Sequence, residues 1–234
     1  MNKKGHVVAI VSGGLDSVSM AYHLANQGYS LTLISYDYGQ RHKKEIEFAQ
    51  LCAQRLTAEH HIVDLTVLTS LMNTSSLTSP DVEVPDGHYA EETMKITVVP
   101  NRNAIMINIA TALAVSRKHD FVATGVHGGD HFIYPDCRPE FIASQSETLR
   151  LSNAGFISDS FEVLAPFVNI SKGDIVTLGE NIGIPWIETW SCYKGGDIHC
   201  GSCGTCFERR EAFEIAGVAD PTRYATTPRF SDPR

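Results

Sequence analysis

The sequence lacks both a long uninterrupted hydrophobic run and an excess of positive charge. Its 234 residues include 19 Lys and Arg against 27 Asp and Glu, which gives a formal net charge of −8 at pH 7. Polar residues interrupt the apolar stretches before they reach the length of a membrane-spanning helix, and the first residues lead directly into an apolar segment. We therefore expect a cytoplasmic protein with no membrane partner. The acidic balance also argues against direct nucleic-acid binding over a broad surface.

Cysteine is scarce outside one short stretch of the chain. Four of the six cysteines lie between residues 192 and 206, and from the first residues we expect no secretory signal. Such clustering in a chain without a signal indicates metal binding, because disulfide frameworks belong mainly to secreted proteins. The length allows one full domain with a small appendage.

Strand-like segments alternate with helical ones, which is typical of a parallel α/β sheet. The predicted strands are 6–11, 31–36, 61–65, 121–126 and 161–167. The predicted helices are 16–27, 43–56, 104–118, 139–151, 171–180 and 207–216. The helix over 104–118 is apolar almost all round, which predicts a central buried helix. Residues 66–98 lack a clear period and predict an excursion over the active-site edge, such as a lid.

The most specific local motif is Ser12-Gly13-Gly14-Leu15-Asp16-Ser17, between the first predicted strand and the first predicted helix. The glycines let the backbone approach an anion, and the loop N–H groups and the helix N-terminus then face phosphates. Two serine hydroxyls add donors, and Asp16 is suited to hold the Mg²⁺ that accompanies a nucleotide. The spacing of a Walker A loop is absent.

This motif resembles the PP-loop of the ATP pyrophosphatase superfamily. Members of that superfamily cleave ATP to AMP and pyrophosphate while they adenylate a substrate oxygen. The resemblance implies a Rossmann-like, adenine nucleotide α-hydrolase-like domain. The expected ATP-binding residues are Val11, Ser12, Gly13, Gly14, Leu15, Asp16, Ser17, Val18, Ser19 and Met20.

Further polar residues follow the later strands, at the edge where open α/β sheets bind ligands. The substrate-binding candidates are Arg102, Asn103, Asp130, Tyr134, Asp136 and Arg138. Lys172 lies at a predicted helix start, where a cation opposes the helix dipole. A lysine at that place is suited to neutralise a polyphosphate, so Lys172 and Asp16 are the catalytic candidates.

The cysteines Cys192, Cys200, Cys203 and Cys206 follow the spacing C-x7-C-x2-C-x2-C. Four thiolates can close a tetrahedral site with no open position, which predicts one structural Zn²⁺ per chain. An iron–sulfur cluster is the main alternative, and His199 is a spare ligand. Cys52 lies on an apolar helix face and is expected in the core. Cys137 lies in the predicted ligand loop, where a nucleophilic role stays open.

Taken together, the motifs resemble the 7-cyano-7-deazaguanine synthase (QueC) family. The resemblance rests on the PP-loop, on Val99-Pro100-Asn101-Arg102-Asn103-Ala104, on Tyr134-Pro135-Asp136-Cys137-Arg138-Pro139-Glu140-Phe141, and on Thr189-Trp190-Ser191-Cys192-Tyr193. It extends from about residue 6 to the last cysteine. Residues 127–131 are richer in Gly and His than is typical of the family, and residues 67–97 do not help to identify it.

The resemblance implies an ATP-dependent ligase that forms a C–N bond. The expected reaction converts 7-carboxy-7-deazaguanine and ammonia to 7-cyano-7-deazaguanine (preQ0), a queuosine precursor, through an acyl-adenylate and an amide. It also implies a homodimer. We expect residues 1–185 to form the ATP-binding α/β domain and residues 186–234 a zinc-binding segment packed on it.

Two other functions remain open at this stage. One is a PP-loop enzyme that adenylates tRNA during its modification, although the paired cysteines here belong to a four-thiol set and the acidic charge disfavours tRNA. The other is a zinc-ribbon module that binds a nucleotide without turnover.

Overall fold

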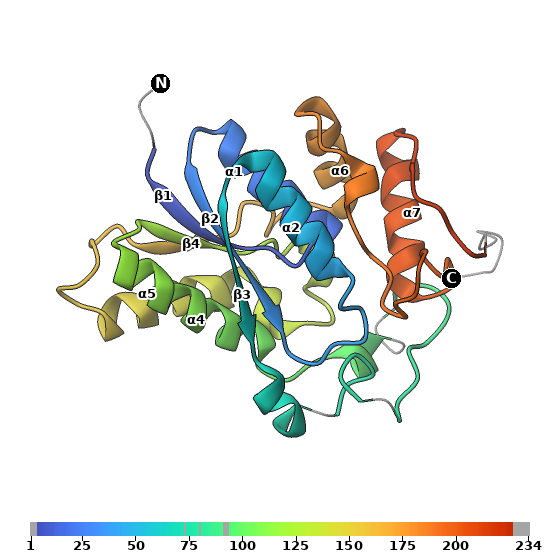
Figure 1. The fold of residues 1–234 in the computed structure, drawn as a ribbon, viewed down its shortest axis with the longest axis horizontal. Coiled ribbons are helices and arrows are strands. Elements are labelled where there is room, and N and C mark those ends of the chain that lie inside the picture. Colours follow the sequence, from blue (N-terminus) through green and yellow to red (C-terminus); the bar gives the residue numbers. More distant parts are fainter. Residues whose placement is uncertain (1–3, 73, 80, 91–93, 227–234) are drawn as a thin grey trace.

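The computed structural model describes residues 4–72, 74–79, 81–90 and 94–226. Five parallel strands form one sheet in the order β3-β2-β1-β4-β5 (Figure 1). The strands are β1 His6–Ile10, β2 Ser30–Asp37, β3 Glu59–Asp64, β4 Phe121–Ala123 and β5 Glu162–Leu164. The strand order reverses beside β1, and in sheets of this kind the reversal opens a crevice at the carboxyl ends of the strands. The predicted fold class is confirmed.

Alternation along the strands divides the core into two layers. In β1, Val7 and Ala9 join one apolar cluster while Val8 joins the other, as the two-residue period of a strand requires. Helices cover both faces of the sheet (Figure 1). One face packs against α1 Leu15–Asn26, α2 Glu45–Leu56, α6 Lys172–Asn181 and α7 Gly204–Ala216, and the other against α4 Arg102–Arg117 and α5 Pro139–Ser152.

Helix α4 corrects one expectation from the sequence. It is buried along one side only, through Ile107, Ala110, Thr111 and Ala114, so the prediction of an all-round buried helix is wrong. The stretch Lys95–Arg117 is also long and apolar enough to cross a membrane by length and composition, with 33% of its most apolar window buried inside the protein. From the interrupted apolar stretches of the sequence we expect no segment of that kind. The buried side packs on β1 and β4, so this helix serves as an outer layer of the sheet.

The residues that the structure describes between β3 and α4 have little regular structure, as expected. The 3₁₀ turns Thr66–Leu71 and Lys95–Thr97 lie among them. Leu77 and Met94 nevertheless lie in the core cluster of the α4 face, so much of the excursion is packed. Gly87 N–H donates to Ser202 O at 2.9 Å, which ties it to the cysteine-rich segment. Its use as a lid stays a prediction.

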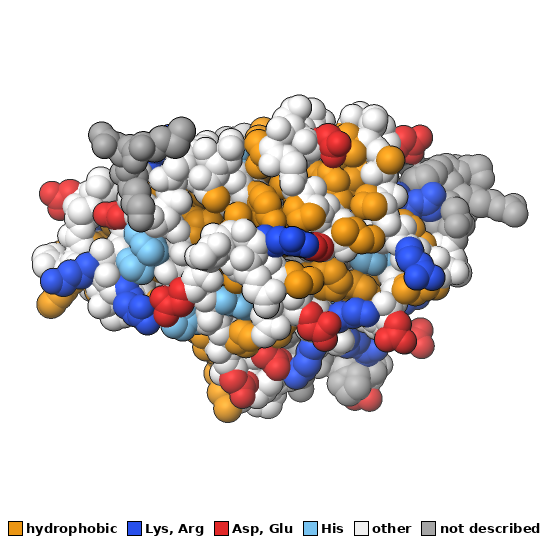
Figure 2. All heavy atoms as spheres, turned by 45° about the horizontal axis from the view of Figure 1, so that its top comes forward, with side chains coloured by type: hydrophobic (Ala, Val, Ile, Leu, Met, Phe, Trp, Pro, Cys, Tyr) orange, Lys and Arg blue, Asp and Glu red, His pale blue; other side chains and the backbone are white. Residues whose placement is uncertain are grey.

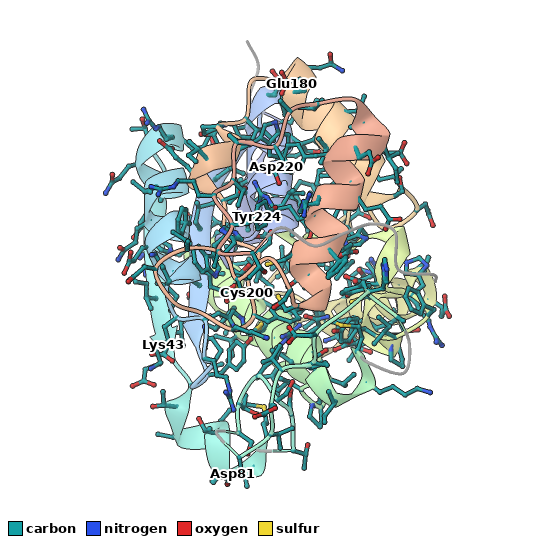
Figure 3. All side chains as sticks on the ribbon, turned by 90° about the vertical axis from the view of Figure 1, so that its right-hand side faces the viewer. Lys43, Asp81, Glu180, Cys200, Asp220 and Tyr224 are labelled. Atoms are coloured by element: carbon teal, nitrogen blue, oxygen red, sulfur yellow. The ribbon has the colours of Figure 1, made fainter. Side chains whose placement is uncertain are left out.

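The C-terminal segment returns to the sheet domain and packs on it. Helix α7 lies against α6, and in Figure 3 Asp220, Tyr224 and Cys200 follow one another beside α7. Arg209 is 1% exposed. Its guanidinium donates to Thr189 Oγ1 at 2.7 Å and to Trp186 O at 3.0 Å, and it pairs with Asp220 at 3.3 Å. One buried cation thus joins α7 to the chain on both sides of it.

Candidate functional site

The loop between β1 and α1 is organised by its own serines. Gly14 N–H donates to Ser12 Oγ at 3.2 Å, and Ser12 N–H donates to Ser17 Oγ at 3.2 Å. The Ser17 hydroxyl in turn donates to Gly14 O at 3.1 Å. These bonds curl the loop over the N-terminus of α1, where the helix dipole favours an anion.

Gly13 is fixed from two sides. Its φ is +97°, and a Cβ built on it would lie 1.9 Å from Glu45 O and 2.9 Å from Ala49 N. Its carbonyl accepts a 2.9 Å hydrogen bond from Trp190 N–H. The loop therefore needs a glycine here, because α2 presses against one side, and the C-terminal segment closes the other.

Beside the loop, a lysine bridges two carboxylates from distant parts of the chain. Lys172 Nζ lies 3.2 Å from Asp16 Oδ2 and 2.5 Å from Glu208 Oε2. Burial disfavours the ammonium, but the charges of Asp16 and Glu208 outweigh it and raise the pKa of Lys172. Burial raises the pKa of Glu208, which Lys172 opposes. The cation at the start of α6 is thus held over the phosphate loop.

A recess lined by aromatic rings continues from the loop. The partly buried Arg102 lies over the ring of Tyr38, 5.8 Å from its centroid, and donates to Tyr38 Oη at 3.2 Å. The Tyr134 hydroxyl is 2.7 Å from Thr97 Oγ1. Tyr193 and Tyr36 also line the recess. Such a pocket suits a planar, partly anionic ligand, because rings offer stacking faces and the guanidinium offers paired donors.

The recess and the phosphate loop form one cavity with about 1130 Å³ of space, part of it open to solvent. Two ionisable groups in its wall are strongly perturbed. Burial raises the pKa of Glu45 to about 8 and lowers that of His42 to about 3. Burial therefore favours the neutral form of both side chains, whereas Arg102 carries a charge on that side of the recess.

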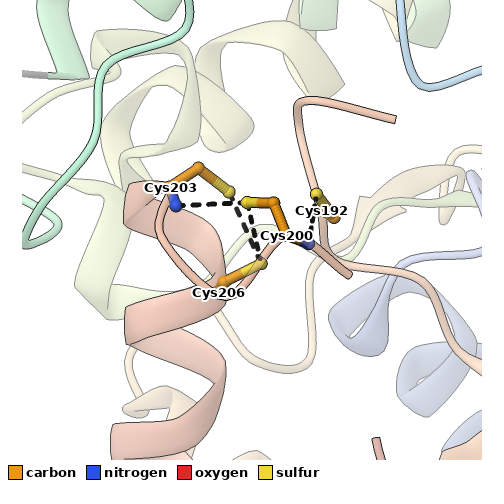
Figure 4. Close-up of side chains that lie close together, drawn as sticks. All are labelled: Cys192, Cys200, Cys203 and Cys206. Atoms are coloured by element: carbon orange, nitrogen blue, oxygen red, sulfur yellow. Dashed lines mark hydrogen bonds between the residues drawn. The ribbon is translucent and has the colours of Figure 1, made fainter. Parts of the chain in front are cut away.

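The four clustered cysteines converge on one point (Figure 4). Their sulfurs all lie within 4.8 Å of one another, with Cys203 and Cys206 at 3.5 Å and Cys200 and Cys206 at 3.8 Å. Cys200 Sγ accepts N–H bonds from Ser202 and Cys203, each at 3.3 Å. Donors of this kind stabilise negative charge on a thiolate. The four residues can therefore hold a metal ion.

Comparison with known proteins gives the family. A family model described as "Queuosine biosynthesis protein QueC" matches residues 6–217. The chain belongs to the QueC family. A protein named 7-cyano-7-deazaguanine synthase from Rhizobium leguminosarum bv. trifolii is 57% identical over 217 residues, which cover 93% of this chain and 91% of that protein. One of the same name from Rhizobium rhizogenes is 58% identical over 217 residues, with the same shares of both chains covered.

Solved structures support the same fold for this QueC family member. The NMN synthetase of Francisella tularensis superposes with a TM-score of 0.51 at 15% identity, over 98% of this chain and 91% of that one. At this identity the likeness concerns the fold alone.

The structure brings most of the predicted site residues of this QueC family member to one cavity. The lining residues among them are Val11, Ser12, Gly14, Leu15, Asp16, Ser17, Arg102, Asn103, Asp130, Tyr134 and Lys172. The predicted ATP-binding and substrate-binding residues that do not line it are Gly13, Val18, Ser19, Met20, Asp136 and Arg138. Asp136 Oδ2 accepts from Asn103 N–H at 3.2 Å, and Arg138 Nε donates to His131 O at 2.8 Å. These last two side chains hold loops beside the cavity.

Several lining residues were not chosen as site residues from the sequence. They include Glu45, Tyr89, Tyr193 and Glu208. Tyr193 belongs to the Thr-Trp-Ser-Cys-Tyr motif and could have been chosen on that signal. Glu208 lies two residues after the last cysteine, and no local pattern distinguishes it from the other glutamates of α7.

The structure also shows the surroundings of Cys137, Cys52 and His199, the remaining cysteines and the histidine considered as a metal ligand. Cys137 is buried, and burial raises the pKa of its thiol, which disfavours the nucleophilic thiolate. Cys52 lies in the core cluster, as predicted. His199 Nε2 accepts a hydrogen bond from Ser191 N–H at 3.0 Å. This nitrogen is therefore occupied by the backbone and does not serve as a spare metal ligand in this arrangement.

Proposed function

We propose that this chain converts 7-carboxy-7-deazaguanine, ammonia and ATP to 7-cyano-7-deazaguanine. Its relatives carry the name of that activity. The observation that carries the proposal is the single cavity in which a phosphate loop faces an aromatic recess with a guanidinium, Arg102. Such a cavity can hold ATP and a planar carboxylate substrate side by side, as adenylation requires.

Adenylation makes the carboxylate reactive by giving it a good leaving group. A substrate carboxylate oxygen attacks the α-phosphorus of ATP, and pyrophosphate leaves toward the Ser12–Ser17 loop. The loop N–H groups, the two serine hydroxyls and Lys172 stabilise the charge that develops there. Asp16 is the residue that would hold Mg²⁺, which neutralises phosphate oxygens when bound.

The nitrogen enters in the second stage. Ammonia attacks the acyl-adenylate and displaces AMP, which gives the primary amide. A second ATP activates the amide oxygen, and loss of that oxygen with AMP leaves the nitrile. Arg102 pairs with the substrate carboxylate, the tyrosine rings stack on the base, and Asn103 and Asp130 bind its polar edge. Asp136 and Arg138 contribute by holding Asn103 and the 131–138 loop.

The four cysteines hold one structural Zn²⁺. A tetrahedral zinc with bonds of about 2.3 Å separates its sulfurs by about 3.8 Å, and two of the sulfur pairs lie at 3.5 and 3.8 Å. An iron–sulfur cluster distributes its thiolates over several irons and therefore needs wider spacing. The metal holds the segment 186–234 together on the ATP-binding domain 1–185; the part of that segment after residue 226 lies outside the described residues.

The protein works as a homodimer in the cytoplasm. Reduced thiols for a metal site fit a reducing compartment, and the outer side of α4, with Ile105, Ile109 and Leu113 only partly buried, offers apolar area to a second copy. Light scattering tests the dimer.

Figure 2 looks obliquely on the side that carries α1, α2, α6 and α7, and there charged side chains of both signs are mixed among hydrophobic ones. A tRNA-modifying role therefore finds no support on that face.

The test is one reaction mixture of purified protein, 7-carboxy-7-deazaguanine, Mg-ATP and ammonium, analysed by mass spectrometry. The nitrile should appear together with AMP. The Asp16→Ala variant should lose turnover but keep its fold, whereas the matched change Asp159→Ala, at an exposed carboxylate, should leave turnover unchanged. If the wild-type protein leaves both base and ATP intact, the proposed function is wrong.

A further inference from the structure

The loop after β4 places one buried histidine at the centre of the carboxylate cluster. His127 is 0% exposed. Its Nε2 lies 3.5 Å from Asp130 Oδ2, 3.8 Å from Asp16 Oδ2 and 3.9 Å from Glu208 Oε1. At these distances the nitrogen has no hydrogen-bond partner among the described residues. A buried polar atom left in this way is costly, so it needs a role.

The other ring nitrogen determines what Nε2 can do. Gly129 N–H donates to His127 Nδ1 at 3.1 Å. Nδ1 is therefore the acceptor, and in the neutral imidazole the proton is on Nε2. A Cβ at Gly129 would lie 2.9 Å from His127 Cε1, so the glycine lets the ring fit under the loop. This accounts for His127 and Gly129 within the Gly- and His-rich stretch 127–131.

This tautomer distinguishes two roles for the cluster. His127, Asp130 and Glu208 have ligand atoms close enough to hold a metal ion. A metal at Nε2 needs that nitrogen free of its proton and the other one protonated. The Gly129 N–H occupies the position that such a proton on Nδ1 would take. The ring is therefore arranged as a donor to carboxylates and not as a metal ligand.

We propose that His127 is a positioning residue: a shift of about 0.5 Å lets its unpartnered Nε2–H donate to Asp130 Oδ2, the nearest carboxylate oxygen at 3.5 Å, and so orients that carboxylate for the substrate. Asp130 is held at its other oxygen by the Tyr89 hydroxyl, at 2.8 Å to Oδ1, so the two donors together set its orientation. The same Nε2–H faces Asp16 and Glu208 and reduces the repulsion among the three carboxylates, two of which pair with Lys172. This inference rests on the proposed function, in which Asp130 binds the base.

Two substitutions separate the two ends of the imidazole. The His127→Asn variant keeps an acceptor near the position of Nδ1, for the N–H of Gly129, but loses the Nε2–H donor that faces Asp130. His127→Gln keeps a donor near Nε2 but loses the acceptor for Gly129. We expect Asn to lower kcat/KM for the base by about 10- to 100-fold, the effect of a lost hydrogen bond to a charged group. We expect Gln to remain close to wild type, with His131→Asn in the same loop as the matched control.

Melting temperatures of both variants show whether they fold, and ¹⁵N NMR of the wild-type ring identifies the Nε2–H tautomer directly. If the His127→Asn variant is active and the His127→Gln variant is not, the histidine acts only by accepting the hydrogen bond from Gly129 N–H, and the proposal is wrong. A proton on Nδ1 would also overturn it, in favour of the metal ligand. An inactive wild type would instead refute the proposed function, so the two failures can be told apart.

Discussion

Replacing Gly13 with alanine is expected to destabilise the whole molecule, although the change adds only one methyl group. The new Cβ would lie 1.9 Å from Glu45 O, a backbone atom of α2 that cannot rotate away. The φ of +97° adds a backbone cost for any residue with a side chain. About 1–2 kcal/mol for the left-handed conformation and about 1–3 kcal/mol for overpacking give a loss of about 2–5 kcal/mol.

The matched control is Gly14→Ala, one position further along. Gly14 has a φ of −71°, and its Cβ would meet Ser12 Oγ at 3.2 Å, a side-chain atom that can move. Urea unfolding of both variants measures the difference, which is a large part of the about 5–15 kcal/mol that stabilises a typical domain. Equal unfolding midpoints for wild type and Gly13→Ala would refute the account of this loop.

Three further changes test other parts of the site. Arg102→Met should raise KM for the base at least about 10-fold by removing a charge-assisted pair, while KM for ATP stays constant; steady-state kinetics with each substrate varied decides it. Cys200→Ser should lower metal content and melting temperature together, and a variant without metal but with full stability contradicts the structural role. Because burial raises the pKa of Glu45 from 4.5 to about 8, wild-type stability should fall as pH rises through that interval, since ionisation is costly only in the folded state. Glu45→Gln should lack this fall in urea midpoints measured across the same range.

The sequence predicts the sheet well because each strand has a strong local signal. The β-branched run His6–Ile10 and the apolar run of β2 need no tertiary information to be recognised. The burial of α4 was predicted wrongly, because apolar residues on its outer side look the same in the sequence as those that face β1. Composition does not reveal which side of a helix has a partner.

The sequence predicts those site residues that belong to a local motif. It does not predict those that only the folded chain brings to the site. Asp16 and Lys172 were named for their places beside a glycine loop and at a helix start, and the structure brings them within 3.2 Å of each other. Glu208 was missed because its contact with Lys172 joins positions 36 residues apart. The role of His127 depends on a backbone N–H two residues away and on two other elements, none of which its residue type indicates.

The hydrogen bond from Trp190 N–H to Gly13 O has a consequence for synthesis of the protein. The Ser12–Ser17 loop leaves the ribosome before Trp190 does, because Trp190 lies 177 positions after Gly13. Domains tend to fold from the N-terminus as the chain emerges, so β1 and α1 can form while this loop is still open on one side. The nascent protein therefore completes its phosphate site only after the segment that bears Trp190 has emerged and docked.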